Sequence, residues 1–189
     1  MNGMISPNTK AILLLTAPLR AGRGASSGDP LTLGEYRRLA RALRDGAHEP
    51  ADLLTMDATE ALGAGAALFD ATRLQRLIGR GFLLAEAAER WQARGIWVIS
   101  RADREYPRRF KARLKDDSPP VLYGCGEMTL LETGGLAVVG SRHVDAWLGR
   151  YAENVGRLAA EAGRTLVSGG ARGIDRAAMN GALTAGGND

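Results

Sequence analysis

Two short turns rich in glycine carry the residue types that hold phosphate groups in proteins. Each turn directly follows a short apolar segment, residues 136–139 and residues 165–167. Glycine lets backbone N–H groups approach a ligand closely, and arginine adds a full positive charge. The two turns therefore predict a binding site for an anion, most simply a phosphate. The residues that would form it are Gly140, Ser141, Arg142, Gly169, Gly170, Arg172 and Gly173.

The elements around these turns favour a strand–helix–strand unit. The segment between the turns has apolar residues at spacings of three and four, as in an amphipathic helix, and Gly163 ends it. Such a unit places its two strands parallel and adjacent, so both turns emerge at the same edge of the sheet. A second helix starting near Ile174 would direct its positive end there, and we expect Asp175 to cap it. The apolar positions are Leu148, Ala152, Val155, Leu158, Ala159 and Ala162.

A simpler explanation of the glycines stays open. They would then only make tight turns between strands and helices, with Arg142 solvated. The spacing also differs from the G-x-G-x-x-G pattern, so the sequence does not predict a dinucleotide site.

The polar residues favour binding over catalysis. His48 and His143 are isolated, and Cys125 has no histidine nearby in sequence, so no pair of nucleophile and base is visible. Two histidines and one cysteine cannot supply a zinc cluster. We therefore predict no catalytic residue, no metal and no cofactor.

Composition agrees with a soluble protein that meets an anionic partner. The chain has a net charge of +4 and a pI near 9.6, which favours such a partner without proving one. A single cysteine excludes an internal disulfide, and no apolar run is long enough to span a membrane. We expect a cytoplasmic protein with no membrane partner.

Two further segments are basic. A helix over residues 32–45 places several arginines on its outer face, which is either solvated or in contact with nucleic acid. Residues 101–115 hold seven basic side chains against two acidic ones. They form either a DNA-facing patch or an exposed helix with Phe110 and Leu114 buried, where Asp116 and Asp117 offset part of the charge. The arginines of the helix are Arg37, Arg38, Arg41 and Arg44.

Four motifs follow one another in the chain: Tyr106-Pro107-Arg108-Arg109-Phe110, Pro119-Pro120-Val121-Leu122-Tyr123, Val139-Gly140-Ser141-Arg142 and residues 168–175. In this order they resemble the DNA-processing protein A (DprA/Smf) family, over about residues 90 to 186. The resemblance implies single-stranded DNA binding on an extended Rossmann domain and delivery of that DNA to the recombinase RecA. It adds Ser168 and Asp175 to the site. Gly170 departs from it, because a leucine is common there, and so does the segment 143–149.

The fold class that we predict is α/β: an incomplete extended Rossmann-like parallel sheet preceded by a small all-helical domain. The helical domain would cover residues 1–80 and the DNA-binding domain residues 81–189. The expected strands are residues 96–99, 121–123, 136–140 and 165–168, few for such a sheet. We therefore expect a fragment of a longer protein, and a homo-oligomer for the complete one.

Three weaker possibilities remain. The turn at residues 62–65 faintly resembles a helix-hairpin-helix, whose glycines offer N–H groups to DNA phosphates; otherwise it is a plain helical turn. The paired glycine turns are also similar to those of lysine-decarboxylase-like phosphoribohydrolases, which bind or hydrolyse nucleotides. Finally, the protein would be an interaction scaffold if the turns bind no ligand.

Overall fold

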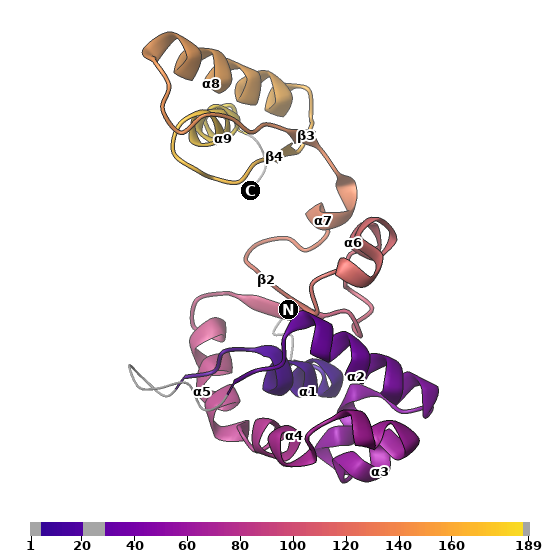
Figure 1. Cartoon of the computed structure of the whole chain (residues 1–189). Coiled ribbons are helices and arrows are strands. Elements are labelled where there is room, and N and C mark those ends of the chain that lie inside the picture. Colours follow the sequence, from indigo (N-terminus) through magenta and orange to yellow (C-terminus); the bar gives the residue numbers. More distant parts are fainter. Residues whose placement is uncertain (1–4, 21–28, 187–189) are drawn as a thin grey trace. The chain divides into compact units, whose positions relative to one another are not determined.

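The computed structural model describes residues 5–20 and 29–186 (Figure 1). Helices precede the first strand, and from β1 (Trp97–Ser100) onward strands and helices alternate, so the described chain mixes helices with small sheets, as in the predicted α/β class. The chain forms two compact units, residues 1–126 and residues 127–189, here called unit 1 and unit 2. The division at residue 80 and the extended Rossmann-like sheet stay predictions. Within the described ranges, no helix is long and apolar enough to cross a membrane.

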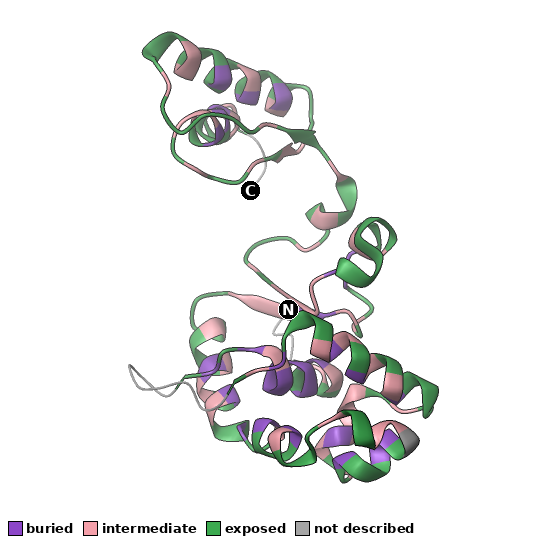
Figure 2. Cartoon of the chain, in the orientation of Figure 1, coloured by how far each residue is buried: buried purple, intermediate pink, exposed green. Residues whose placement is uncertain are grey.

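Unit 1 is built around its first helix. The helix α1 (Pro7–Thr16) contains an apolar run, residues 11–15, that is almost completely buried among the other helices (Figures 1 and 2). Ser6 caps it by accepting a hydrogen bond from the N–H of Thr9 at 3.1 Å. The remaining helices are α2 (Leu33–Asp45), α3 (Ala58–Leu62), α4 (Ala71–Ile78), α5 (Gly81–Gln92) and the 3-10 helices η1 (Pro50–Leu54) and η2 (Gly63–Leu68).

Leucines make up most of the core of unit 1. Ile12 and Leu15 of α1 join one cluster, and Leu13 and Leu14 join a second. One helix therefore connects both clusters, because its apolar run has no polar face. The first cluster also contains Leu31, Tyr36, Leu39, Leu43, Leu53, Leu62, Leu74 and Leu77.

Unit 1 also contains a pair of antiparallel strands. The strand β1 (Trp97–Ser100) pairs with β2 (Val121–Gly124), with Trp97 opposite Gly124. The helix α6 (Arg108–Leu114) and the 3-10 helix η3 (Lys115–Asp117) lie between them in the chain. The expectation that both strands belong to a parallel sheet is wrong for this pair.

Asp103 fixes the chain at the end of β1. Its carboxylate accepts hydrogen bonds from the Ser100 N–H at 2.7 Å and from the hydroxyls of Ser6 and Thr9, both at 2.5 Å. The Thr9 hydroxyl also lies 2.8 Å from that of Ser100. These contacts attach the start of α1 to the turn after β1. These contacts stabilise the turn that follows β1, a turn that local sequence patterns do not predict.

Unit 2 contains the predicted strand–helix–strand unit. The strands β3 (Leu136–Ala137) and β4 (Leu166–Val167) pair in parallel, with Leu136 opposite Leu166, and the helix α8 (Ala146–Glu161) connects them. This confirms the predicted adjacency, although both strands are shorter than expected. The helices α7 (Leu130–Thr133) and α9 (Ile174–Thr184) complete the described part of the unit.

Glycines bring α8 and α9 close together. A Cβ atom on Gly156 would overlap the carbonyl oxygen of Ala178, and one on Gly181 would overlap that of Glu153. The buried faces consist of small residues, while Leu158, expected to point inward, is half exposed (Figure 2). That expectation was wrong because Ala152, Gly156 and Ala159 form the buried face of α8, and Leu158 lies beside this face.

Candidate nucleic-acid interface

The structure joins the two predicted turns of unit 2 by two hydrogen bonds. The N–H of Ile174 donates to the carbonyl oxygen of Ser141 at 3.1 Å. The N–H of Gly140 donates to the Asp175 carboxylate at 3.0 Å. Residues 35 positions apart in the chain are thereby held in one site.

Asp175 has a different role from the one expected. The N-cap of α9 is Gly173, and no side chain caps this helix. The Asp175 side chain is almost fully buried and accepts instead from Gly140 in the other turn. Because a buried carboxylate needs hydrogen-bond donors, this contact stabilises the carboxylate and braces the two turns.

Two of the glycines are required by the contact between the turns. A Cβ atom on Gly140 would lie 2.7 Å from the side chain of Ile174. Gly173 has a φ of +94°, and a Cβ there would overlap the Ser141 carbonyl oxygen. Both positions therefore exclude other residues for packing reasons, whatever ligand the turns hold.

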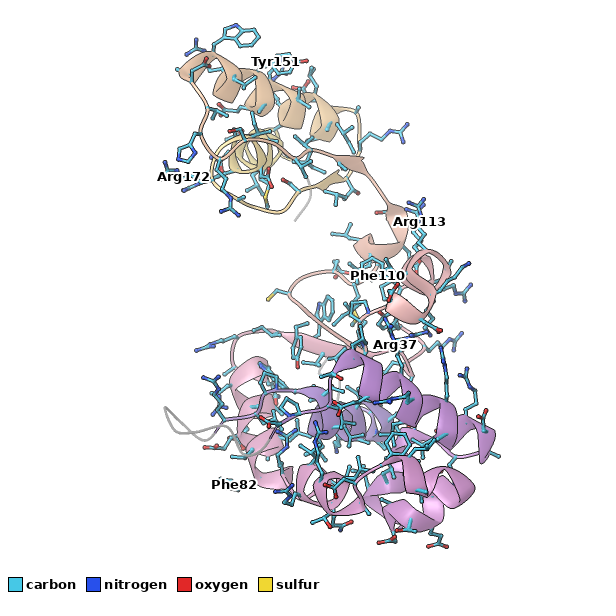
Figure 3. All side chains as sticks on the ribbon, in the orientation of Figure 1. Arg37, Phe82, Phe110, Arg113, Tyr151 and Arg172 are labelled. Atoms are coloured by element: carbon cyan, nitrogen blue, oxygen red, sulfur yellow. The ribbon has the colours of Figure 1, made fainter. Side chains whose placement is uncertain are left out.

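The arginines of the turns are free to bind an anion. The side chains of Arg142 and Arg172 are exposed and make no ion pair or hydrogen bond with any described residue. Figure 3 shows Arg172 beside the turn that carries it. The Ser168 hydroxyl oxygen is buried without a hydrogen-bond partner in the described structure. By contrast, the Ser141 hydroxyl is engaged locally, donating to the His143 carbonyl oxygen at 2.7 Å. Exposed cations and an unpaired hydroxyl thus surround the braced backbone.

Comparison with known proteins agrees with the residues already described. Residues 97–189 match the family model of DNA recombination-mediator protein A. This part of the chain belongs to that family. The resemblance seen in the sequence is thereby confirmed. No curated protein and no solved structure matches the chain.

The region that belongs to the recombination-mediator family includes both turns and the β1–β2 pair. It therefore extends over all of unit 2 and the end of unit 1. In the part of the chain that the structure describes, no group of three or more His, Cys, Asp or Glu side chains could hold a metal ion.

Sequence reasoning missed an aromatic pair beside the first turn of this family region. Trp147 and Tyr151 stack with ring centroids 5.8 Å apart and planes inclined by 15°. They are 65% and 58% exposed, although aromatic side chains of this size are usually buried. Both lie at the start of α8, directly after Asp145, which caps the helix by accepting from the Leu148 N–H at 2.7 Å. The spacing of four on a predicted helix was the signal that could have found them.

The packing of the basic segments of unit 1 differs in part from the expected one, and their contact with DNA stays a prediction. In α6, Phe110 is half-buried, but Leu114, expected to be buried, is 42% exposed. Asp116 and Asp117 do offset positive charge, but that of α2: they form ion pairs with Arg41 and Arg37. The two basic segments therefore meet on one surface of unit 1.

Proposed function

We propose that the two turns of unit 2 bind single-stranded DNA and that the protein acts as a mediator of DNA recombination. The observation that carries the proposal is the pair of braced turns with exposed, unpaired arginines, inside a region of the DNA recombination-mediator protein A family. The same proposal includes delivery of this DNA to RecA, a cytoplasmic site of action, an extended Rossmann-like domain and a homo-oligomeric assembly. The DNA-binding residues are Gly140, Ser141, Arg142, Ser168, Gly169, Gly170, Arg172, Gly173 and Asp175.

The chemistry of the turns suits a phosphodiester backbone. The planar guanidinium groups of Arg142 and Arg172 can each bind a phosphate through two parallel hydrogen bonds. Asp175 contributes indirectly, because it holds Gly140 and so positions the turn that carries Arg142. The contacts involve no base edge, so we expect binding without marked sequence preference.

The exposed aromatic pair favours a single strand over a duplex. Unpaired bases can stack on the outer faces of Trp147 and Tyr151, while the bases of a duplex are already stacked on each other. Aromatic stacking contributes about 1–3 kcal/mol per base and tolerates any sequence. The pair lies directly after the turn that carries Arg142, where a bound strand would continue.

Binding without catalysis fits the position of the one buried carboxylate of the site. Asp175 accepts from a backbone N–H and lies against Gly169, where a Cβ would be 3.0 Å from its oxygen. It is therefore engaged in holding the turns together. Release of free base from nucleoside monophosphates, abolished by Asp175→Asn, would instead support a nucleotide hydrolase.

The proposal is tested by measuring the affinity for a labelled oligothymidine by fluorescence anisotropy over a salt series. Arg142→Ala should weaken binding by about 1.5–3 kcal/mol, because a charge-assisted contact is lost. Arg164→Ala is the matched control, since Arg164 is also exposed and unpaired among the described residues of unit 2. The logarithm of the affinity should fall with that of salt by about 0.7 per phosphate neutralised. Equal affinity of parent and Arg142→Ala would refute the assignment.

A further inference from the structure

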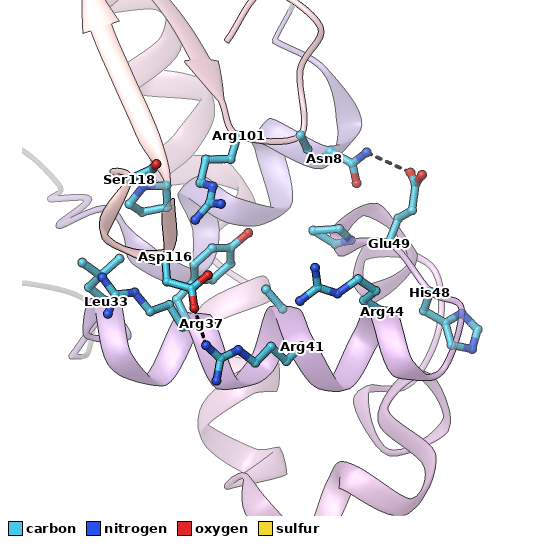
Figure 4. A pocket seen from close by; sticks show the side chains of 15 residues that line it. Asn8, Leu33, Arg37, Arg41, Arg44, His48, Glu49, Arg101, Asp116 and Ser118 are labelled. Carbon is cyan, nitrogen blue, oxygen red and sulfur yellow. Dashed lines mark hydrogen bonds and ion pairs between the residues drawn. The ribbon is translucent and has the colours of Figure 1, made fainter. Parts of the chain in front are cut away.

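Unit 1 contains a cavity of about 350 Å³ that the function proposed for unit 2 does not use (Figure 4). It lies between α2 and the segment 101–120, with residues 48–50 and Asn8 at its edge. Four arginines line it against two carboxylates, so the lining carries an excess of positive charge. Its volume is at the lower end of the range for small-ligand sites, about 300–1,000 Å³.

Two ion pairs hold the walls of this cavity together. Arg41 of α2 contacts Asp116 at 2.5 Å, and Arg37 contacts Asp117. The partners are 75 and 80 residues apart in the chain. These pairs also engage both aspartates, and Glu49 accepts from the Asn8 amide at 2.9 Å. The nearby carboxylates are therefore already occupied.

Several donors in the cavity remain without an acceptor. The side chains of Arg44 and Arg101 make no hydrogen bond or ion pair with any residue that the structure describes, and both extend into the cavity (Figure 4). The Arg37 Nε is buried and also has no partner within the described ranges. Arg44 is exposed and Arg101 is partly buried, so of these groups only the buried Arg37 Nε departs from the rule that buried polar groups are hydrogen-bonded. Together with the excess of positive charge in the lining, this unpaired donor favours an anionic ligand.

We propose that this cavity binds a phosphate of a nucleic-acid strand and forms a second DNA contact, independent of the turns of unit 2. Guanidinium groups match the geometry of phosphate, and two of them on different segments can hold it from both sides. The adjoining segment 101–115, with its seven basic side chains, would attract the rest of the strand.

The test compares two double variants of the whole chain that lose the same charge. Arg44→Ala with Arg101→Ala removes the two unpaired cavity arginines. Arg38→Ala with Arg104→Ala is the control, because these exposed arginines lie on the same two segments but do not line the cavity. The probe is the labelled oligothymidine, followed by anisotropy from low to physiological salt. Thermal unfolding checks that both variants keep the fold.

The cavity variant should bind about tenfold more weakly than the parent, and its salt slope should fall by about 0.7, the value for one neutralised phosphate. The control should stay within about twofold. Equal losses in both variants would overturn the inference, because only general charge would matter. Loss with Arg142→Ala but not with the cavity variant overturns the inference and leaves the proposed function standing. The reverse result overturns the proposed function alone, and a parent chain that binds no oligonucleotide at low salt overturns both.

Discussion

The two units of this protein differ in the side chains that form their cores. Unit 1 buries large leucines around α1, and several of its arginines are engaged in contacts within the unit. Unit 2 buries alanines and glycines between α8 and α9, and the arginines of its two turns have no partner among the described residues. Unit 1 thus uses several of its cations for structure, whereas the two turns of unit 2 leave theirs available.

This difference shows that counting positive charges does not locate a binding site. The helix α2 has four arginines, but Arg37 and Arg41 are paired with aspartates far away in the chain. The turns of unit 2 contain only Arg142 and Arg172, and both are free of such contacts in the described structure. The informative property of a cation is whether a partner already holds it.

The largest effect on stability is expected where α8 and α9 pack through glycines, and it should leave the leucine core of unit 1 unchanged. Gly181→Val should destabilise unit 2 by roughly 4 kcal/mol, because the new side chain overlaps the Glu153 carbonyl and forces α8 and α9 apart. Hydrogen exchange followed by mass spectrometry should show faster exchange in residues 146–184 and unchanged exchange in α1. Unchanged exchange in α8 would mean that the close glycine contact does not support the unit.

The next effect concerns a buried cation that stabilises unit 1. Arg80 donates to the carbonyl oxygens of Leu14, of Ala17 at 3.2 Å and of Leu77 at 3.3 Å, and burial lowers its pKa. Arg80→Leu should cost about 3 kcal/mol, since it leaves buried carbonyl groups without donors. The exposed Arg76→Ala is the control and should change the free energy of unfolding by less than about 0.5 kcal/mol. Urea unfolding measures both, and equal stabilities would contradict the structural role of Arg80.

Acid should weaken unit 1 through Glu35. The hydrogen bond from Arg73 lowers the pKa of Glu35 from 4.5 to about 2, with a smaller contribution from Thr32. A lowered folded-state pKa gives stability that is present above the unfolded value and is lost as the pH falls through the folded one. The stability advantage of the parent over Glu35→Gln should therefore shrink between pH 4.5 and about 2. Urea midpoints over this range measure it, with the exposed Glu89→Gln as control; a constant difference would contradict the assignment.

The smallest expected effect is a gain in the stability of unit 2. Gly149 lies inside α8, and a Cβ there would meet no atom within 4 Å. Gly149→Ala should therefore stabilise unit 2 by about 0.5–1 kcal/mol, because alanine loses less conformational freedom in a helix. It is also the matched control for Gly181→Val, since both add a side chain to a helical glycine. A loss of stability would show that α8 needs this glycine.

Local signals in the sequence were sufficient to predict the strand–helix–strand unit. The apolar period of residues 148–162, Gly163 and the two glycine turns predicted parallel strands, and β3 and β4 confirm them. The boundaries were less accurate, because the turns tie residues 138–140 and 168 into loops and leave two-residue strands. The assignment of the site residues to DNA binding stays a prediction.

Long-range contacts account for most of what the sequence did not predict. Asp103 attaches the end of β1 to Ser6 and Thr9, which lie more than 90 residues away. The brace between Asp175 and Gly140 and the ion pairs of α2 are similarly distant. No periodicity or spacing can reveal a contact between residues that only the folded chain brings together.

The contact between Asp103 and the start of α1 also sets an order of events during synthesis. Ser6 precedes Asp103 by 97 residues. At about 5–20 residues per second, the ribosome needs roughly 5–20 s to make them. Throughout that time the apolar helix lacks the residues that anchor its first turn, and it is exposed to chaperones and proteases. A nascent chain stalled before residue 103 should be cleaved within α1 faster than one that extends past residue 126, even though the helix itself was among the first segments to be made.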